Sequence, residues 1–342
     1  MLEIKNLTPF AAALVPVMDA RGKEGATVVV KGTFALPKAR AASGALAVAD
    51  QQAKIELGDV PFFDPPEKSS VRYAAESSPT KAATDVVLVG HAYALGGRGE
   101  TVDVVLRIGP VAKMARVFGD RKWQRAIGRW RPSDPKPFDR MPLVFERAFG
   151  GWDTTSPDPR KHAFEPRNPV GVGFAASRLS SPEGLPLPNL EDPRFLISAT
   201  KDQPAPAGFG FIGPAWTPRR ERAGTYDARW KKDRFPLLPL DFDPQFFQAC
   251  LPDQIVRGHL QGGEPVAISN ASPSRELSFT VPRRNLEITV WLRGQPTIHR
   301  PALDTFIVEP DENRALCVWK TTFPCPRQFL HIDLVRIRES AP

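Results

Sequence analysis

Apolar runs and alternating patterns in the first third of the chain predict β-strands. GATVVVKGTFAL (Gly25–Leu36) is rich in β-branched residues and is bounded by turn residues. TDVVLVGHAYAL (Thr84–Leu95) starts as a continuous apolar run and then alternates, and Glu100–Gly119 predicts two strands joined by a turn at Gly109-Pro110. The sequence GGRGE, which ends just before Thr101, is typical of a hairpin loop.

The last third of the chain returns to strand patterns. Two strand-like segments, Gly263–Ser272 and Arg275–Arg284, flank a Ser-Pro-Ser turn. Thr305–Phe323 predicts a hairpin, because the residues Asp-Glu-Asn between its two apolar halves favour a turn. Phe329–Glu339 alternates strictly, which predicts a strand with one face in water.

Proline changes this picture in the middle of the chain. The 342 residues include 37 prolines, about twice the usual share, and proline interrupts both helices and central strands. Aromatic and aliphatic residues are interleaved with these prolines, so we expect an ordered, loop-rich layer rather than disorder. Asp243 and Pro244 predict one short helix by capping and first-turn preference.

We therefore predict a mainly β fold with antiparallel, sandwich-like sheets, a long proline-rich irregular middle and few short helices. The predicted organisation is a single domain, 1–342. It contains an N-terminal β region (1–118), a proline- and aromatic-rich loop layer (119–253) and a C-terminal β region (254–342). Trp123, Trp130 and Trp152 are expected to be buried as anchors of the loop layer.

Charge and composition narrow the location and the partner class. The net charge is +8, which favours an acidic protein surface, a nucleic acid or merely good solubility. Basic and acidic residues are mixed along the chain, and no nucleic-acid-binding pattern accompanies them. The amino terminus lacks a signal-peptide pattern, no apolar run is long enough for a membrane helix, and three cysteines (Cys250, Cys317, Cys325) form no disulfide framework. These features predict a cytoplasmic protein with no membrane partner.

The usual signs of chemistry are missing from the sequence. Five histidines, His91, His162, His259, His299 and His331, show no metal-ligand spacing with one another or with cysteine. Nucleophile motifs and phosphate-binding glycine loops are absent as well. We therefore predict no catalytic residue, no cofactor and no metal.

One segment, MPLVFERAFGGWD (Met141–Asp153), allows two interpretations. Glu146 and Asp153 are available as the acid and nucleophile of a carbohydrate-active enzyme, whose carboxyls stand about 5–10 Å apart. The adjacent Glu146 and Arg147 favour a structural ion-pairing or hydrogen-bonding element instead. Gly150 and Gly151 indicate positive φ or close backbone packing. We expect Glu146, Arg147, Gly150, Gly151 and Trp152 to be a structural motif.

A succession of segments resembles a known bacterial family. They are SSVRY, VFGDRKW, MPLVFERAFGGWD, RNPVGVGF, LPNLEDPRFLI, PAGFGFIGPAW and FPLLPLDFDPQFF, together with the early strand VVVKGTFAL and the late hairpin. The family is a domain-of-unknown-function family encoded beside type VI secretion effectors with PAAR-like tips, whose members are described as effector adaptors or chaperones. The resemblance covers almost the whole chain.

The resemblance implies a non-enzymatic, cytoplasmic protein that holds a cognate secreted effector at its PAAR-like or toxin region. Such a protein helps to load the effector onto a VgrG-type spike. The resemblance supplies no functional residues that can be assigned to positions of this chain. From the residues alone, the charged part of the contact surface is expected to include Arg219, Arg220, Arg222, Lys231 and Lys232. A carbohydrate-active enzyme using Glu146, and a basic nucleic-acid-binding protein, remain the alternatives.

Overall fold

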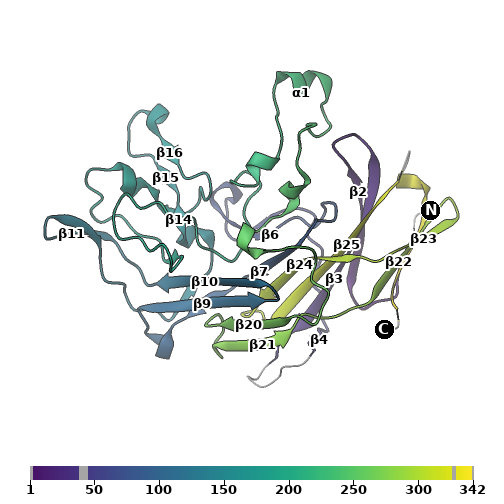
Figure 1. The fold of residues 1–342 in the computed structure, drawn as a ribbon, viewed down its shortest axis with the longest axis horizontal. Helices are drawn as coiled ribbons and strands as arrows, with labels where there is room; N and C mark the ends of the chain where they lie inside the picture. Colours follow the sequence, from purple (N-terminus) through teal and green to yellow (C-terminus); the bar gives the residue numbers. More distant parts are fainter. Residues whose placement is uncertain (1–2, 38–44, 326–328, 341–342) are drawn as a thin grey trace.

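Three β-sheets form the framework of the computed structural model, which describes residues 3–37, 45–325 and 329–340 (Figure 1). The largest sheet has seven strands and contains the long central strands of the molecule. Its strands, in spatial order, are β19 (Ile255–Val256), β7 (Thr84–Leu88), β24 (Ala302–Glu309), β25 (Arg314–Pro324), β3 (Glu24–Ala35) and β2 (Ala11–Met18), with β4 (Ala47–Val48) paired to β3.

Two further sheets flank this one. The five-stranded sheet has the order β18 (Leu190–Glu191), β10 (Val111–Phe118), β9 (Thr101–Ile108), β20 (Pro265–Ser269) and β21 (Glu276–Thr280). The four-stranded sheet has the order β1 (Glu3–Asn6), β26 (Ile332–Glu339), β22 (Leu286–Leu292) and β23 (Gln295–His299).

Most strand pairs are antiparallel, as the patterns predict. Within the described ranges three named pairs are parallel: β1 with β26, β7 with β24, and β14 (Phe149–Gly150) with β17 (Val172–Gly173). The four-stranded and seven-stranded sheets are therefore mixed, whereas the five-stranded sheet is antiparallel. The pairs β1–β26 and β3–β25 also join the N-terminal and C-terminal regions, so these two regions of the sequence share sheets.

The three sheets share one apolar core. Alternate residues of β3, such as Val28, Val30 and Phe34, are almost wholly buried and face this core, where Leu106 of β9 and Ile288 of β22 also lie. Burial of this kind contributes about 25 cal/mol for each Å² of apolar surface removed from water. One continuous core therefore stabilises all three sheets together.

The predicted hairpins are confirmed. Strands β9 and β10 pair antiparallel around Gly109, whose φ is +53°, and β20 pairs with β21 across the Ser-Pro-Ser turn. Strands β24 and β25 form the late hairpin, and β26 alternates between buried and exposed positions as expected.

One turn prediction is wrong. The segment GGRGE does not close a hairpin, because β8 (His91–Tyr93) pairs with β13 (Arg140–Pro142) rather than with β9. Residues Leu95–Gly97 form a 3-10 turn that leads the chain from one sheet to another. The glycines do form a turn, as their local propensity favours, but the strand that pairs with β8 comes from the middle of the chain.

The proline-rich middle is an ordered layer of short elements, as predicted. Its further strands are β11 (Trp123–Ala126), β12 (Arg129–Pro132), β15 (Trp152–Asp153) and β16 (Ala163–Phe164), while β5 (Val60–Pro61) and β6 (Val71–Tyr73) precede it. Its helix is α1 (Ala228–Asp233). The 3-10 helices of the described chain are η1 (Pro66–Lys68), η2 (Leu95–Gly97), η3 (Phe145–Arg147), η4 (Pro159–Lys161), η5 (Phe174–Arg178), η6 (Arg220–Arg222), η7 (Pro244–Phe247), η8 (Pro252–Gln254) and η9 (Phe329–His331).

Aromatic anchors hold part of this layer. Trp123 and Phe149 are buried in a small core of their own with Leu187 and Ile197, which confirms the expected burial of Trp123. The predicted short helix forms as η7, where the Asp243 side chain accepts a hydrogen bond from the backbone N–H of Gln245. Among the described residues, no helix has the length and apolar character needed to span a membrane.

Candidate functional site

Residues 223–243 form a projection that stands above the sheets and carries α1 at its tip (Figure 1). The helix begins after Asp227, whose carboxylate accepts a hydrogen bond of 2.7 Å from the backbone N–H of Trp230. This N-cap satisfies a donor that the first turn would otherwise leave without a partner. A helix of six residues is too short to be stable alone, so the surrounding contacts must hold it.

Hydrogen bonds and ring contacts hold the projection. The indole N–H of Trp230 donates to the carbonyl of Leu237 at 2.8 Å, and the Trp230 ring packs edge-on against Tyr226 and Phe235. Arg234 donates to the carbonyl oxygens of Leu238 and of Ala20, which precedes β3. The projection is therefore tied both to itself and to the seven-stranded sheet.

The surface of the projection is apolar and basic at once. Tyr226, Phe235 and Leu240 are 51%, 68% and 70% exposed, which is unusual for such large apolar side chains grouped on one feature. Lys231 and Lys232 are exposed on α1 beside them. Aromatic side chains beside cationic ones are typical of protein-binding surfaces.

Four of the five predicted contact residues are accessible on or near this projection. Lys231 and Lys232 lie on α1, whereas Arg220 and Arg222 lie on η6, where Arg220 is exposed and Arg222 is half-buried. The prediction that Arg219 is exposed is wrong. Arg219 is only 6% exposed because its guanidinium turns inward to the carbonyl oxygens of Ile212 and Phe246.

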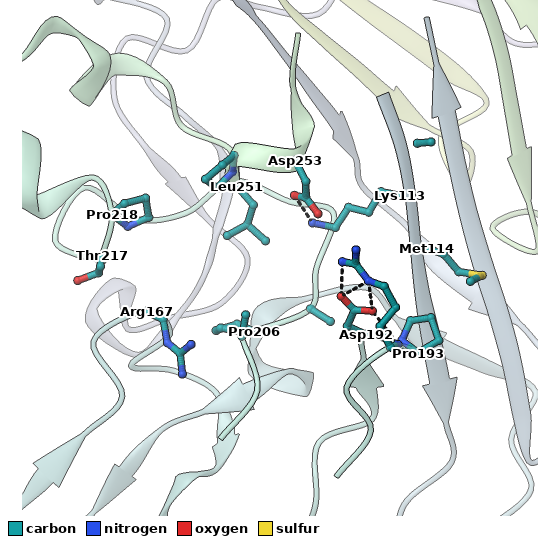
Figure 2. A pocket seen from close by; sticks show the side chains of 15 residues that line it. Lys113, Met114, Arg167, Asp192, Pro193, Pro206, Thr217, Pro218, Leu251 and Asp253 are labelled. Atoms are coloured by element: carbon teal, nitrogen blue, oxygen red, sulfur yellow. Dashed lines mark hydrogen bonds and ion pairs between the residues drawn. The ribbon is translucent and has the colours of Figure 1, made fainter. Parts of the chain in front are cut away.

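A pocket of about 640 Å³ lies at the base of the projection, and we call it the apolar pocket (Figure 2). Strand β10, the 3-10 helix η8 and several loop segments contribute its lining, and just over half of the lining residues are alanine, proline or leucine. The lining residues are Ala112, Lys113, Met114, Arg167, Asp192, Pro193, Arg194, Ala205, Pro206, Ala207, Thr217, Pro218, Leu251, Pro252 and Asp253. Its size lies in the range of pockets that hold a small molecule or one or two side chains of a partner.

A buried lysine lies at one side of the apolar pocket. Figure 2 shows Lys113 extending from β10 toward Asp253, and its Nζ lies 2.8 Å from Asp253 Oδ1 and 3.0 Å from Gln254 Oε1. Burial lowers the pKa of Lys113, and the carboxylate of Asp253 opposes this effect. Lys113 and Asp253 therefore place an ion pair, whose two charges offset each other, beside the apolar lining.

Arginine–carboxylate pairs form the rest of the polar rim. Arg194 pairs with Asp192, and its Nη2 lies 2.6 Å from Asp192 Oδ2. On the other side, Arg167 makes two hydrogen bonds of 2.7 Å with Glu165. An apolar floor bordered by such charges is suited to an apolar side chain that is flanked by polar backbone or charged groups.

The segment Met141–Asp153 ties distant parts of the chain together. The carboxylate of Glu146 accepts hydrogen bonds from both the backbone N–H and the hydroxyl of Ser70, at 2.6 and 2.7 Å. Arg147 binds Asp120 and Asn189 instead. A mutual ion pair between Glu146 and Arg147 is therefore wrong. Their role as an ion-pairing or hydrogen-bonding element is confirmed, because each side chain bonds a different segment.

The two glycines of this segment allow close backbone packing. A Cβ on Gly150 would lie 2.1 Å from the carbonyl oxygen of Asn168, and a Cβ on Gly151 would lie 2.2 Å from that of Gly171. Gly151 also has a φ of +92°. The predicted burial of Trp152 is wrong: it is 52% exposed and stacks on Phe164, with ring centroids 4.4 Å apart.

Asp153, the second carboxylate of that segment, is engaged separately. It accepts hydrogen bonds from the Thr155 hydroxyl and from Arg178, and these contacts lower the pKa of Asp153. Both oxygens of Glu146 are occupied by Ser70. Glu146 and Asp153 therefore have different hydrogen-bond partners.

The histidines and cysteines lie in structural surroundings. His91 bonds Asp311 and His162 bonds the carbonyl of Ser156. Cys250, Cys317 and Cys325 are buried. No group of three metal-ligating side chains occurs in the part of the chain that the structure describes.

Sequence patterns missed a buried charged layer on the face of the seven-stranded sheet that points away from the shared core. Lys81 is almost fully buried, and its Nζ lies 2.8 Å from Asp85 and 3.1 Å from Asp304. Lys320, on β25, also approaches Asp304, and Lys31 of β3 pairs with Glu76 at 2.8 Å. These residues come from strands that look apolar and from a distant loop. Only the alternation of Lys31 with apolar neighbours in VVVKGTF hinted at this polar face.

Comparison with known proteins gives one result. A family model described as an uncharacterized protein conserved in bacteria (DUF2169) matches residues 21–320 of the chain. No curated protein and no solved structure matches significantly. Because the match covers well over half of the 342 residues, the chain belongs to this uncharacterized bacterial family, DUF2169.

Proposed function

We propose that the protein is a non-enzymatic adaptor that binds a partner polypeptide through the projection and the adjoining apolar pocket. The observation that carries the proposal is the group of three exposed large apolar side chains, Tyr226, Phe235 and Leu240, beside Lys231 and Lys232. Leaving such side chains in water costs free energy that burial against a partner would recover.

The chemistry of the projection defines the kind of partner. Its lysines favour an acidic surface, and its aromatic rings favour an apolar patch on that surface. The apolar pocket would take a side chain from the same partner, because Thr217 and Pro218 of its lining directly precede the η6 segment at the base of the projection. A rigid, proline-rich lining loses little conformational entropy on binding.

The sequence motifs that resemble effector adaptors supply the partner's identity in this proposal. The adaptor would hold a cognate type VI secretion effector at its PAAR-like or toxin region, in the cytoplasm, and help to load it onto a VgrG-type spike. The contacts of Glu146 and Asp153 support a binding role over the carbohydrate-active alternative, because both carboxylates stabilise the fold through Ser70 and Arg178.

Co-purification from the native host tests the proposal. The product of a neighbouring effector gene should co-purify with the wild-type chain. The triple variant Tyr226→Ala, Phe235→Ala, Leu240→Ala should lose most of it, because interface aromatics often contribute about 2 kcal/mol or more each. Ile127→Ala is the matched control, because Ile127 is fully exposed on the separate β11–β12 hairpin. Full effector secretion from a strain that lacks this protein would reject the proposal.

A second variant tests the apolar pocket. Ala205 is exposed and lines the pocket, so Ala205→Trp should fill it and weaken effector capture by about tenfold or more while the fold is retained. Ala47→Trp, on the exposed strand β4, provides the same added bulk elsewhere. Equal effector capture by the two variants would show that the pocket is not part of the contact surface. The projection would then be the whole contact surface.

A further inference from the structure

A second pocket, of about 470 Å³, is lined in part by Arg219, Phe246 and Phe247, which flank the projection in the sequence. We call it the Arg219 pocket. Its lining combines apolar side chains with one buried cation, and it consists of Val17, Met18, Asp59, Ala74, Ala75, Ser77, Ser78, Pro79, Pro214, Arg219, Phe246, Phe247 and Ala249. No residue of this pocket lines the apolar pocket described above.

Arg219 is a buried cation without an ion pair. Its Nε donates to the carbonyl of Phe246 at 3.0 Å and its Nη1 donates to the carbonyl of Ile212 at 2.7 Å. In the described ranges Arg219 forms no ion pair within 4.0 Å, and its side-chain hydrogen bonds come from Nε and Nη1 alone. The carboxylates of Asp59 and Asp85 act on it only from farther away, and burial lowers its pKa. Buried arginines are normally paired, so this side chain keeps unused donor capacity at the pocket.

The position of the guanidinium is fixed before any ligand arrives. The two carbonyl contacts hold the guanidinium, and the Phe246 ring centroid lies 5.0 Å from its central carbon. A fixed arginine loses little side-chain entropy when it binds an anion. The remaining Nη2 hydrogens therefore provide a prepared site for an anionic oxygen.

The walls of the pocket determine which chemical groups the rest of an anionic ligand can carry. Phe246, Phe247 and Met18 provide apolar surface next to Arg219. The Ser78 hydroxyl oxygen accepts a hydrogen bond from Lys320 Nζ at 2.9 Å, so its own hydrogen remains available to donate. Asp59 is exposed, and its Oδ1 accepts from the backbone N–H of Ala75, so the carboxylate would favour a donor group on the outer part of a ligand.

We infer that the Arg219 pocket binds a carboxylate that is joined to an apolar group. The C-terminal residue of a polypeptide and a free carboxylic acid both have this chemistry. A carboxylate would accept hydrogen bonds from Arg219 Nη2 and the Ser78 hydroxyl, while its apolar group would contact Phe246 and Phe247. This inference does not depend on the proposed adaptor function.

Methionine methyl NMR tests the inference without altering the protein. Of the four methionines, Met18 lines the Arg219 pocket, Met114 lines the apolar pocket, Met141 is buried in the core and Met1 lies outside the described residues. N-acetyl-phenylalanine should shift the Met18 methyl signal and leave those of Met114 and Met141 in place. N-acetyl-phenylalaninamide, which lacks only the carboxylate, should bind more weakly by about tenfold or more.

Two further arms complete the test. Arg219→Met should abolish the Met18 shift, whereas Arg220→Met, at the exposed neighbour, should preserve it. Acetyl-Ala-Ala-Ala-Phe, compared with N-acetyl-phenylalanine, separates the two sources: tighter binding of the peptide identifies a polypeptide C-terminus, and equal binding identifies a free acid. The comparison of acid with amide remains decisive if Arg219→Met fails to fold. Equal binding of acid and amide, or no Met18 shift at about 10 mM ligand, would overturn the inference.

Discussion

Single polar side chains join parts of this chain that are far apart in sequence. Glu146 binds Ser70 by two hydrogen bonds, and Asp304 lies between Lys81 and Lys320 in the charged layer. Hydrogen bonds to a charged group contribute about 1.5–3 kcal/mol, more than neutral ones. Removing one partner of such a contact therefore destabilises the fold, because the charged group that remains loses its hydrogen bonds.

Glu146→Gln should lower the free energy of unfolding by about 1–2 kcal/mol. The amide keeps one acceptor oxygen but places an NH₂ group where Ser70 now donates. Urea denaturation would measure the change, and Glu67→Gln, at an exposed position, is the control. Unchanged stability together with loss of a glycan-cleaving activity would instead favour the enzyme alternative.

Asp304 should make stability depend on pH in the acid range. Burial alone raises the pKa of this carboxyl, but Lys320 and Lys81 outweigh that effect and lower the pKa from 3.8 to about 2. Because the folded-state pKa is lowered, the stabilisation is complete above the ordinary pKa. It is lost as the pH falls from about 4 toward about 2.

Asp304→Asn tests this dependence. The variant should be less stable by about 3–5 kcal/mol near neutral pH, because it leaves Lys81 and Lys320 without their shared carboxylate. The difference between wild type and variant should shrink below about pH 4. Denaturation curves across this range would measure it, and a difference that stays constant with pH would contradict the assignment.

Short elements of the middle layer depend on close backbone contacts. Strands β14 and β17 pair over two residues each, and the side chain of Asn168 donates to the carbonyl oxygens of Phe145 and Phe149 beside them. Asn168 is fully buried. These contacts leave no space for a side chain at Gly150, which explains the pair of glycines better than turn propensity does.

Gly150→Ala should therefore destabilise the layer strongly. Its Cβ would lie 2.1 Å from a backbone oxygen, and relieving this clash requires β14 to move, at a cost of about 3 kcal/mol or more. Gly58→Ala is the control, because no atom lies within 4 Å of a Cβ at that position. Thermal unfolding of the two variants would measure the contrast, and equal melting temperatures would show that the layer adjusts freely.

At the scale of the whole molecule, the sheets form a support and the projection forms the proposed contact surface. The four-stranded and seven-stranded sheets join early and late parts of the chain, so the support needs the chain from β1 to β26. The net charge of +8 adds a general attraction for acidic partners. The position of lysines on an exposed helix would focus this attraction at α1.

Lys231→Glu with Lys232→Glu should slow association with an acidic partner by about tenfold at low salt and weaken its salt dependence. Stopped-flow association rates at several salt concentrations would measure this, with Lys54→Glu as a control because Lys54 is exposed elsewhere. If the double variant lost binding to DNA or RNA rather than to a protein partner, the nucleic-acid alternative would replace the adaptor proposal.

Several features of the fold could be predicted because their causes are local. The turn at Gly109 and the residues Asp-Glu-Asn before Arg314 each define a hairpin within a short segment. Polar and apolar residues alternate in β26 because one face of this strand is in water. The failed predictions are the GGRGE loop, the exposure of Arg219, the burial of Trp152 and the mutual Glu146–Arg147 pair. Each concerns a side chain or strand whose partner lies outside the short segment that the pattern covers.

The sequence by itself determined the mainly β class, the main hairpins, the ordered proline-rich layer and the family resemblance, because hydrophobic periodicity and turn chemistry act over a few residues. Only the tertiary structure decided which apolar residues stay exposed on the projection, and which charges meet in the buried layer of the seven-stranded sheet. A lysine in an apolar strand, such as Lys31, gives no sign of its partner until a distant loop brings Glu76 to 2.8 Å. The pockets beside Lys113 and Arg219 likewise exist only where separate segments converge.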